Sequence, residues 1–429
     1  MLSLLPRAAS VLLLPVVAAA LLLGACSDRP SPSATGADAS AVRTGAEVLA
    51  ANDLARLDGQ RVGLIVNQTS RVDTAHLIDV VHRAPGVELA ALFAPEHGLE
   101  GRADAGETIE DGRDPVTGAP IYSLYGASRE PPAGALDDLD VLVFDVQDVG
   151  ARFYTYISTM GQAMQAAARQ NVPFLVLDRP NPLGGERVAG FVLEPEHRSF
   201  VGAYPIPLQH GMTVGELARM IQNERWLDGL DDLDLSVVPA QGWARSAQWP
   251  DVDRSWVAPS PNIPDFETAL IYPGAAFFEA TSASEGRGTP SPFRLVGAPW
   301  ADAQALADTL NARGLPGVRF EPATFTPTSR PGASSPKLAG ETLSGVRHVI
   351  TDRTAYRSVA TGVHVLHAFY QQAPSPEAFL SRPDWLAKLA GTERFLAMLR
   401  AGHRPPAIID AWTDDIDAFR DRRAPYLLY

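Results

Sequence analysis

Short apolar runs that alternate with helical stretches constrain the fold of this 429-residue chain more than any other feature. The apolar runs are apolar on both faces, which is typical of strands that helices cover from both sides. The first half of the chain therefore predicts an α/β fold with a parallel sheet. The expected strands lie at 62–66, 87–93, 141–144 and 174–177, and the expected helices at 75–83 and 155–170.

The pattern changes near residue 240. Before it, Thr213 and Glu216 form a capping box that predicts a helix at 214–223, followed by a strand at 233–238. Residues 240–264 are dense in Trp and Pro and predict an ordered, irregular connection. We therefore expect an N-terminal domain at 46–239 and a smaller α/β domain at 240–429. The second domain should contain helices at 302–313 and 359–370 and strands at 317–320 and 346–350.

The N-terminus predicts a lipoprotein signal peptide at residues 1–26. Arg7 gives a positive start, residues 8–23 form an apolar core, and Leu23-Gly24-Ala25-Cys26 resembles the cleavage site of bacterial lipoproteins. The alternative is an uncleaved membrane anchor, but an apolar run of about 16 residues is shorter than the roughly 20 that span a bilayer.

These features predict a lipid on Cys26 and an extracytoplasmic, membrane-anchored protein. Ser27 after the cysteine favours the outer membrane, with the protein facing the periplasm. Residues 27–45 are rich in Ser, Ala, Pro, Asp and Gly and predict a flexible tether.

Cysteine count and net charge exclude several classes of site. Cys26 is the single cysteine, so the mature body has no internal disulfide, no cysteine nucleophile and no cysteine metal site. The net charge of -14 and the lack of any basic run disfavour a nucleic-acid partner.

Polar side chains follow each of the four strands predicted in the first half. Open parallel sheets bind ligands outside the carboxyl ends of their strands, so these side chains predict one shared site. The alternative is that they are polar because strand ends reach solvent. The residues are Asn67 and Gln68; Glu96 and His97; Asp145, Gln147 and Asp148, with Arg152, Tyr154 and Tyr156 shortly after; and Asp178, Arg179 and Asn181.

Motifs for several enzyme classes are missing from the sequence. No glycine-rich fingerprint follows the first strand and no G-x-S-x-G elbow occurs, which disfavours a dinucleotide enzyme and an α/β-hydrolase. We expect no cofactor. The carboxylates fit glycoside hydrolysis, or divalent-metal hydrolysis with His97 as a ligand. The metal interpretation lacks a His-x-His or H-E-x-x-H spacing, and His97 could equally orient its loop.

A second glycine-rich stretch carries Glu285, Arg287 and Thr289. Its glycines permit close approach to a ligand or a mobile closure, although a surface hairpin turn is the plainer interpretation. Similarly, Tyr154 and Tyr156 could stack on a sugar ring or belong to the core.

Five segments resemble the NamZ family of exo-β-N-acetylmuramidases, and the resemblance extends from about residue 45 to 429. It implies a Rossmann-like N-terminal domain, a second α/β domain and a cleft between them. It also implies release of N-acetylmuramic acid from the non-reducing ends of peptidoglycan fragments. The segments are 67–70, 92–98, 144–156, 178–182 and 284–289.

This substrate suggests roles for the candidate residues. Glu96 is expected to be the general acid, and Asp145, Asp148 or Glu285 the second catalytic group, unless the 2-acetamido group of the substrate acts as nucleophile. The lactyl carboxylate calls for an arginine. Two alternatives remain, a non-catalytic muropeptide-binding lipoprotein and a metal-dependent cell-wall hydrolase. Candidates for the lactyl contact are Arg102, Arg152, Arg179 and Arg287; the other expected binding residues are Asn67, His97, Gln147, Asp148, Tyr154, Tyr156, Asp178, Asn181 and Thr289.

Overall fold

The computed structural model describes residues 41–104, 106–126 and 128–429. The predicted signal peptide, the lipidation site at Cys26 and residues 27–40 of the predicted tether lie outside the described residues. The described end of that tether packs against the rest of the chain. Val42 is buried in an apolar cluster with Trp243, and the Thr44 side chain caps helix α1 (Gly45–Ala50).

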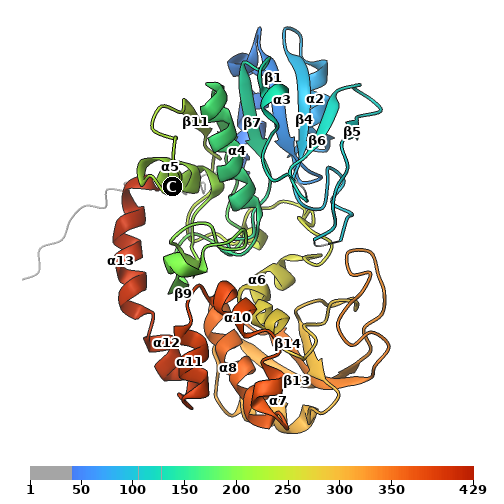
Figure 1. Ribbon diagram of the computed structural model, residues 1–429, viewed down its shortest axis with the longest axis vertical. Helices are drawn as coiled ribbons and strands as arrows, with labels where there is room; N and C mark the ends of the chain where they lie inside the picture. Colours follow the sequence, from blue (N-terminus) through green and yellow to red (C-terminus); the bar gives the residue numbers. More distant parts are fainter. Residues whose placement is uncertain (1–40, 105, 127) are drawn as a thin grey trace, which may run out of the picture. The chain divides into compact units, whose positions relative to one another are not determined.

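A seven-stranded sheet organises the first half of the described chain (Figure 1). Every neighbouring pair of strands is parallel except the edge pair β6 and β5. The chain order reverses between β1 and β7, which is the strand order of a Rossmann sheet and creates a topological switch point there. From one edge to the other the strands are β11 (Leu235–Val238), β8 (Phe174–Leu177), β7 (Val141–Asp145), β1 (Arg61–Val66), β4 (Glu88–Ala94), β6 (Pro120–Ser123) and β5 (Gly112–Arg113).

Helices cover both faces of this sheet, because alternate residues of a strand point to opposite sides. Leu142 and Phe144 of β7 pack with α4 (Tyr156–Gln170) and α5 (Val214–Asn223). Val141 and Val143 of the same strand pack with α1 and α2 (Leu77–Arg83) on the other face. The predicted parallel sheet with helices on each side is therefore confirmed.

Local predictions in the first half agree with the structure. The strands expected at 62–66, 87–93, 141–144 and 174–177 are β1, β4, β7 and β8, each within one residue at either end. The capping box is present, since the Thr213 hydroxyl accepts from the Glu216 amide and the Glu216 carboxylate accepts from the Thr213 amide. The helix expected at 75–83 is α2 preceded by a short strand, β3 (Ala75–His76), that pairs with β2 (Arg71–Val72).

An antiparallel sheet in the order β12-β14-β13 organises the second half. Helix α7 (Ala303–Asn311) packs on β13 and β14, and α8 (Ser358–Gln372) packs on α7 and on α6 (Phe266–Ala275). The helices and strands predicted here are present, whereas α6 and β12 were not predicted. The strands are β12 (Leu295–Ala298), β13 (Val318–Phe325) and β14 (Leu343–Ile350).

The remaining elements connect these two parts. Helix α13 packs against β9, and the Tyr429 hydroxyl donates to Asp178 Oδ2 at 2.7 Å at the end of β8. Contacts group residues 41–429 as one unit, and the boundary expected near 240 stays a prediction. The elements are α3 (Ala133–Leu136), the antiparallel pair β9 (Ala189–Val192) and β10 (Pro207–Gln209), α9 (Pro376–Phe379), α10 (Pro383–Ala390), α11 (Arg394–Arg400), α12 (Pro405–Asp410) and α13 (Thr413–Arg423).

Among the helices of the described chain, none has both the length and the apolar character needed to cross a bilayer.

Candidate active site

A cavity of about 1140 Å³ is lined by residues from both halves of the described chain. The first half contributes the turn after β4 and residues 153–156 at the start of α4. The second half contributes α6, the 285–293 region, the loop at 329–337 and the start of α10. Six of the residues predicted from the sequence line this cavity: Glu96, His97, Tyr154, Tyr156, Glu285 and Arg287.

Glu96 is held by neutral donors. The Thr155 hydroxyl donates to Oε2 at 2.5 Å and the Gly106 amide to Oε1 at 3.1 Å. The side chain is buried, and no ion pair to it occurs within the described residues. Burial, and secondly the charge and hydrogen bond of Glu96, raise the pKa of Tyr125 to about 12, so a neutral phenol stands beside this carboxyl group.

His97 lies next to Glu96 with a positive φ of 71°. Its Nδ1 is 2.7 Å from the carbonyl oxygen of Ala103, and a carbonyl only accepts. Nδ1 therefore carries a proton and donates this hydrogen bond. His97 also lines a neighbouring hollow of about 470 Å³, where Arg102 is exposed and paired with Glu100 at 3.0 Å.

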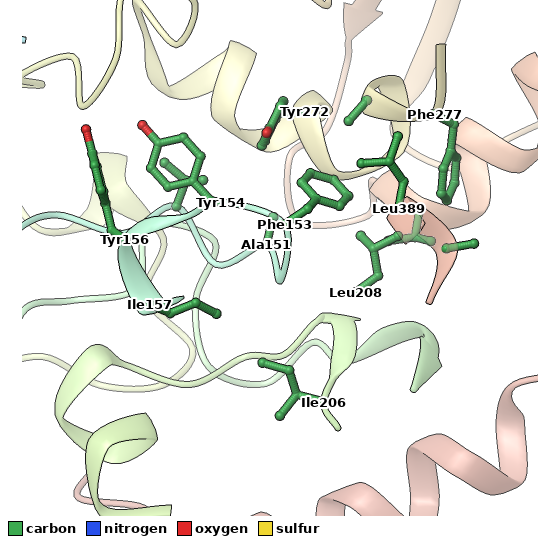
Figure 2. Packing of buried hydrophobic residues seen from close by; sticks show 14 of the residues in the cluster. Ala151, Phe153, Tyr154, Tyr156, Ile157, Ile206, Leu208, Tyr272, Phe277 and Leu389 are labelled. Atoms are coloured by element: carbon green, nitrogen blue, oxygen red, sulfur yellow. The ribbon is translucent and has the colours of Figure 1, made fainter. Parts of the chain in front are cut away.

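Aromatic rings form one wall of the cavity. The rings of Tyr154 and Tyr156 meet edge to face with centroids 5.0 Å apart, and Figure 2 shows their hydroxyls on the same side. Tyr272 of α6 meets Phe153 at 5.2 Å and Phe293 at 4.8 Å. Burial raises the pKa of all three tyrosines well above the usual 10, so they are hydrogen-bond donors. These rings are buried and belong to the apolar core, so stacking of Tyr154 or Tyr156 on a sugar stays a prediction.

Glu285 lies next to two positively charged side chains. Its Oε2 lies 2.7 Å from Lys337 Nζ, and its Oε1 lies 3.6 Å from Arg287 Nε. Arg287 also donates to Glu279 at 2.7 Å. Burial alone would lower the pKa of Arg287, but the carboxylates of Glu279 and Glu285 outweigh it and raise this pKa above its ordinary value. The two carboxyl groups Glu285 and Glu96 thus have contrasting neighbours.

The polar side chains at the switch point between β1 and β7 make their hydrogen bonds within the protein. Asp145 is fully buried and makes a bidentate pair with Arg179, at 2.6 and 2.8 Å. Asn67 accepts from the amide and hydroxyl of Thr69, and Gln147 donates to backbone carbonyls. These predicted residues therefore lie outside the cavity wall.

Three further predicted residues fix turns beneath the site. Asp148 accepts from the Gly150 amide at 2.6 Å. Asn181 accepts from the Leu183 amide and donates to the Met212 carbonyl. Asp178 binds the start of α5, which satisfies backbone donors that the first turn of a helix leaves free. Its four donors are Arg179 N, Thr213 Oγ1, Gly215 N and Tyr429 OH.

Arg152 and Thr289 are also used within the protein. Arg152 is fully buried, and its guanidinium donates to the carbonyls of Phe191, Ile206 and Leu389 at 2.8, 2.8 and 2.9 Å. The Thr289 hydroxyl donates to the Gly286 carbonyl at 2.6 Å. Of the four candidate arginines, Arg287 alone lines the main cavity. The roles expected for the residues outside it stay predictions.

Several residues of the cavity were not predicted. Thr155 lies between two tyrosines that were, so its motif offered a signal. Lys337 carried another signal, because it and Lys388 are the only lysines among 36 basic residues. Tyr125, Tyr272, Glu279 and Trp385 offered none, because they reach the cavity from distant parts of the chain.

The fold and the cavity together define a class of protein. An α/β enzyme whose cavity holds two buried glutamates beside aromatic rings has the equipment of a glycoside hydrolase. Residues 62–267 match the N-terminal region and residues 270–429 the C-terminal region of exo-beta-N-acetylmuramidase NamZ. The chain therefore belongs to the NamZ family, as the sequence motifs predicted.

Individual relatives agree with this assignment. Peptidoglycan beta-N-acetylmuramidase NamZ from Bacillus subtilis strain 168 is 42% identical over 390 residues, which cover 90% of this chain and 91% of the relative. A crystal structure of a DUF1343 family protein from Bacteroides fragilis is 37% identical, with a TM-score of 0.82 over 90% of this chain and 99% of that one. A second DUF1343 structure from the same organism is 32% identical, with a TM-score of 0.74 over 91% and 99%.

Proposed function

We propose that this protein is an exo-acting glycoside hydrolase that releases N-acetylmuramic acid from the non-reducing ends of peptidoglycan fragments. One observation carries the proposal. A chain 42% identical to a peptidoglycan β-N-acetylmuramidase has a cavity that places two buried glutamates beside aromatic side chains.

Glu96 acts as the general acid in this proposal. A general acid must hold a proton until the leaving oxygen of the glycosidic bond takes it. Glu96 lines the cavity, is buried, contacts the Thr155 hydroxyl and the Gly106 amide, and makes no ion pair within the described residues. Thr155 Oγ1 can also accept a hydrogen bond, so it can hold the carboxyl group in place in either protonation state.

Glu285 takes the second catalytic role. Glycosidic cleavage develops positive charge on the sugar ring, and a carboxylate beside the ring stabilises it as nucleophile, base or electrostatic partner. Glu285 lines the cavity and lies within ion-pair distance of Lys337 and Arg287. Asp145 and Asp148, the other two residues expected for this role, do not line the cavity: Asp145 is paired with Arg179, and Asp148 accepts from the Gly150 amide.

Two substrates with different leaving groups test the assignment. Glu96→Gln should lower kcat on a disaccharide of N-acetylmuramic acid and N-acetylglucosamine by on the order of 100- to 10,000-fold. It should affect a dinitrophenyl muramic-acid glycoside much less, because that leaving group needs no proton. Glu285→Gln should slow both substrates. The exposed, Arg400-paired Glu377 offers a control, since Glu377→Gln should leave both rates unchanged.

Other outcomes would overturn the proposal. Full turnover of the disaccharide by Glu96→Gln would remove Glu96 from the role of acid. Muropeptide binding without any turnover would support a non-catalytic binding lipoprotein, and loss of activity with a strong chelator would support a metal-dependent hydrolase. The anomer of the first-formed product distinguishes retention from inversion.

We further propose that the protein is lipid-anchored through Cys26, at the outer membrane and facing the periplasm. The positive start, the apolar core and the Leu23-Gly24-Ala25-Cys26 sequence support it. Such an anchor would keep the enzyme near the peptidoglycan chain ends that it cleaves.

A further inference from the structure

Lys337 contacts both the Glu285 carboxylate and the backbone that leads to it. Its Nζ lies 2.7 Å from Glu285 Oε2, and its side chain is about one-third exposed. The ammonium donates its three protons to three carbonyls that lie shortly before Glu285 in the chain, so its contact with Glu285 is an ion pair without a hydrogen bond. The three carbonyls belong to Phe278 at 2.7 Å, Thr281 at 3.0 Å and Ala283 at 2.5 Å.

The geometry of these contacts explains why a lysine stands here. Lys337 and Lys388 are the only lysines in a chain with 36 basic residues, so arginine is the default cation of this protein. Three carbonyls that converge on one point suit the compact, tetrahedral ammonium group. A planar guanidinium presents its donors in a fixed fork and is too large for such a point.

Glu285 depends on Lys337 for its nearest positive charge. The other cation, Arg287, is 3.6 Å away and donates to Glu279 at 2.7 Å. Removal of the ammonium would leave Glu285 sharing one guanidinium with a second carboxylate. The ion pair that holds Glu285 Oε2 beside the ammonium would then be lost.

Lys337 lies in the loop between β13 and β14, which other contacts hold beside the cavity. Asn262 Nδ2 donates to the Gly332 carbonyl at 2.6 Å, and the Ser334 amide donates to Asp104 Oδ2 at 2.7 Å. The loop therefore brings the ammonium to Glu285 from a position 52 residues further along the sequence.

We propose that Lys337 is a positioning residue of the glycosidase reaction, which holds the Glu285 carboxyl group in place in the cavity through this ion pair. The proposal rests on the catalytic role proposed for Glu285. Lys337 does not itself have to touch the substrate. Its effect should therefore appear in kcat and in the pH profile, and should depend on Glu285.

The first experiment compares Lys337→Met with Lys388→Met in the full chain. Lys337→Met should lower kcat by on the order of 100-fold, the size expected when a catalytic group is misplaced. KM should stay within about threefold, and the acidic limb of the pH–rate profile should move to higher pH. Lys388 is exposed, so Lys388→Met should match the wild type. An unchanged pH profile, or a rise in KM alone, would overturn the proposal.

A double-mutant cycle separates this inference from the proposed function. If Lys337 works through Glu285, Glu285→Gln combined with Lys337→Met should be no slower than Glu285→Gln alone, within about threefold. Additive losses would overturn the positioning role while leaving Glu285 catalytic. Full activity of Glu285→Gln by itself would remove the catalytic role, and the inference with it.

A chemical rescue distinguishes loss of the ammonium group from poor folding of the variant. Cys26 is the only cysteine, so Lys337→Cys in a Cys26→Ser background has a single thiol. Alkylation with 2-bromoethylamine converts that thiol into a close copy of the lysine side chain. Activity and the wild-type pH profile should return on alkylation. A fully alkylated, folded protein that stays inactive would contradict the proposal.

Discussion

Glu96 and Glu285 have the same side chain, but their neighbours in the cavity differ. Glu96 contacts a hydroxyl and an amide, whereas Glu285 contacts an ammonium and a guanidinium. Enzymes commonly separate an acid from a charged partner by such differences in environment. The sequence alone does not reveal this difference between Glu96 and Glu285, because Lys337 lies far from both glutamates in the chain.

The hydroxyl of Thr155 provides a direct test at the residue scale. Thr155→Val keeps the shape of the side chain but removes the donor 2.5 Å from Glu96 Oε2. We expect kcat/KM for the disaccharide to fall by roughly tenfold, the equivalent of one hydrogen bond to a reacting group. Thr159→Val, one turn along α4, is the matched control, because the buried Thr159 hydroxyl has no partner within the described chain. Equal rates in the two variants would argue against a role for Thr155.

Buried His348 predicts a pH dependence of stability. Burial, and also the nearby charge of Arg294, lower the pKa of His348 from 6.5 to about 4. Between these values the unfolded chain binds a proton that the folded chain does not, so the free energy of unfolding falls as pH drops from 6.5 to 4. The loss is on the order of 3 kcal/mol.

Denaturant unfolding at several pH values checks this dependence. His348→Gln should have a flatter profile between pH 6.5 and 4, although it starts from lower stability. His403 is exposed, so His403→Gln should keep the wild-type slope. Parallel profiles for wild type and His348→Gln would show that this histidine does not titrate on unfolding.

At the scale of elements, helices α6 and α8 approach so closely that only glycines fit between them. A Cβ on Gly362 would lie 2.3 Å from the Gly274 carbonyl oxygen and 2.4 Å from its Cα. These are backbone atoms, which cannot move aside as the flexible end of a side chain can. Because α6 also carries Tyr272 to the cavity, this contact links helix packing to the site.

Gly362→Ala should therefore affect both stability and activity. We expect the free energy of unfolding to fall by roughly 1–3 kcal/mol, as for other overpacked cores. KM should rise because α6 has to shift. Gly134→Ala in α3 is the control, since its added Cβ meets no atom within 4 Å and alanine favours a helix. Thermal unfolding and steady-state kinetics of both variants give the comparison, and equal melting temperatures would refute the expectation.

The elements differ in how well the sequence predicted them, for physical reasons. Continuous buried runs predicted β1, β4, β7 and β8 closely, because parallel strands covered on both faces need such runs. Helix α6 was missed because it is apolar almost all round and contains Pro273, so it shows no helical stripe.

The same limit applies to the site. Polar residues at strand ends were expected to converge, but whether they face a ligand or each other depends on packing. Asp145 and Arg179 pair with each other, whereas Glu96 reaches the cavity. Local sequence looks the same in both cases, so only the fold separates them.

At the scale of the whole molecule, the two halves of the described chain share structural contacts. Arg152, close to the cavity residues of the first half, donates to the Leu389 carbonyl at the end of α10. Arg423 at the end of α13 donates to carbonyls of Gly185, His210 and Gly211. The cavity between residues of both halves is thus held by buried, charged hydrogen bonds, which are stronger than neutral ones.

The proposed lipid anchor gives a prediction for the intact protein in its cell. Cys26→Ser should move the protein from the detergent phase to the aqueous phase, because the acyl chains that bind the membrane are lost. Its kcat on a soluble disaccharide should stay unchanged, because Cys26 precedes the described fold. Separation of inner and outer membranes on a density gradient then tests the destination. Equal detergent partitioning of both proteins would refute lipidation at Cys26.

The hydrogen bond from Tyr429 to Asp178 also has a consequence for the order in which the fold is completed during protein synthesis. The two residues are 251 positions apart, and ribosomes make Asp178 first. During that interval Asp178 lacks one of its four donors, and the carbonyls of Gly185, His210 and Gly211 lack the Arg423 guanidinium. These contacts at the end of β8 and beside β10 are therefore completed only after the segment at 413–429 has been made. A growing chain lacks them until then, so a segment made late helps to stabilise the sheet that is made first.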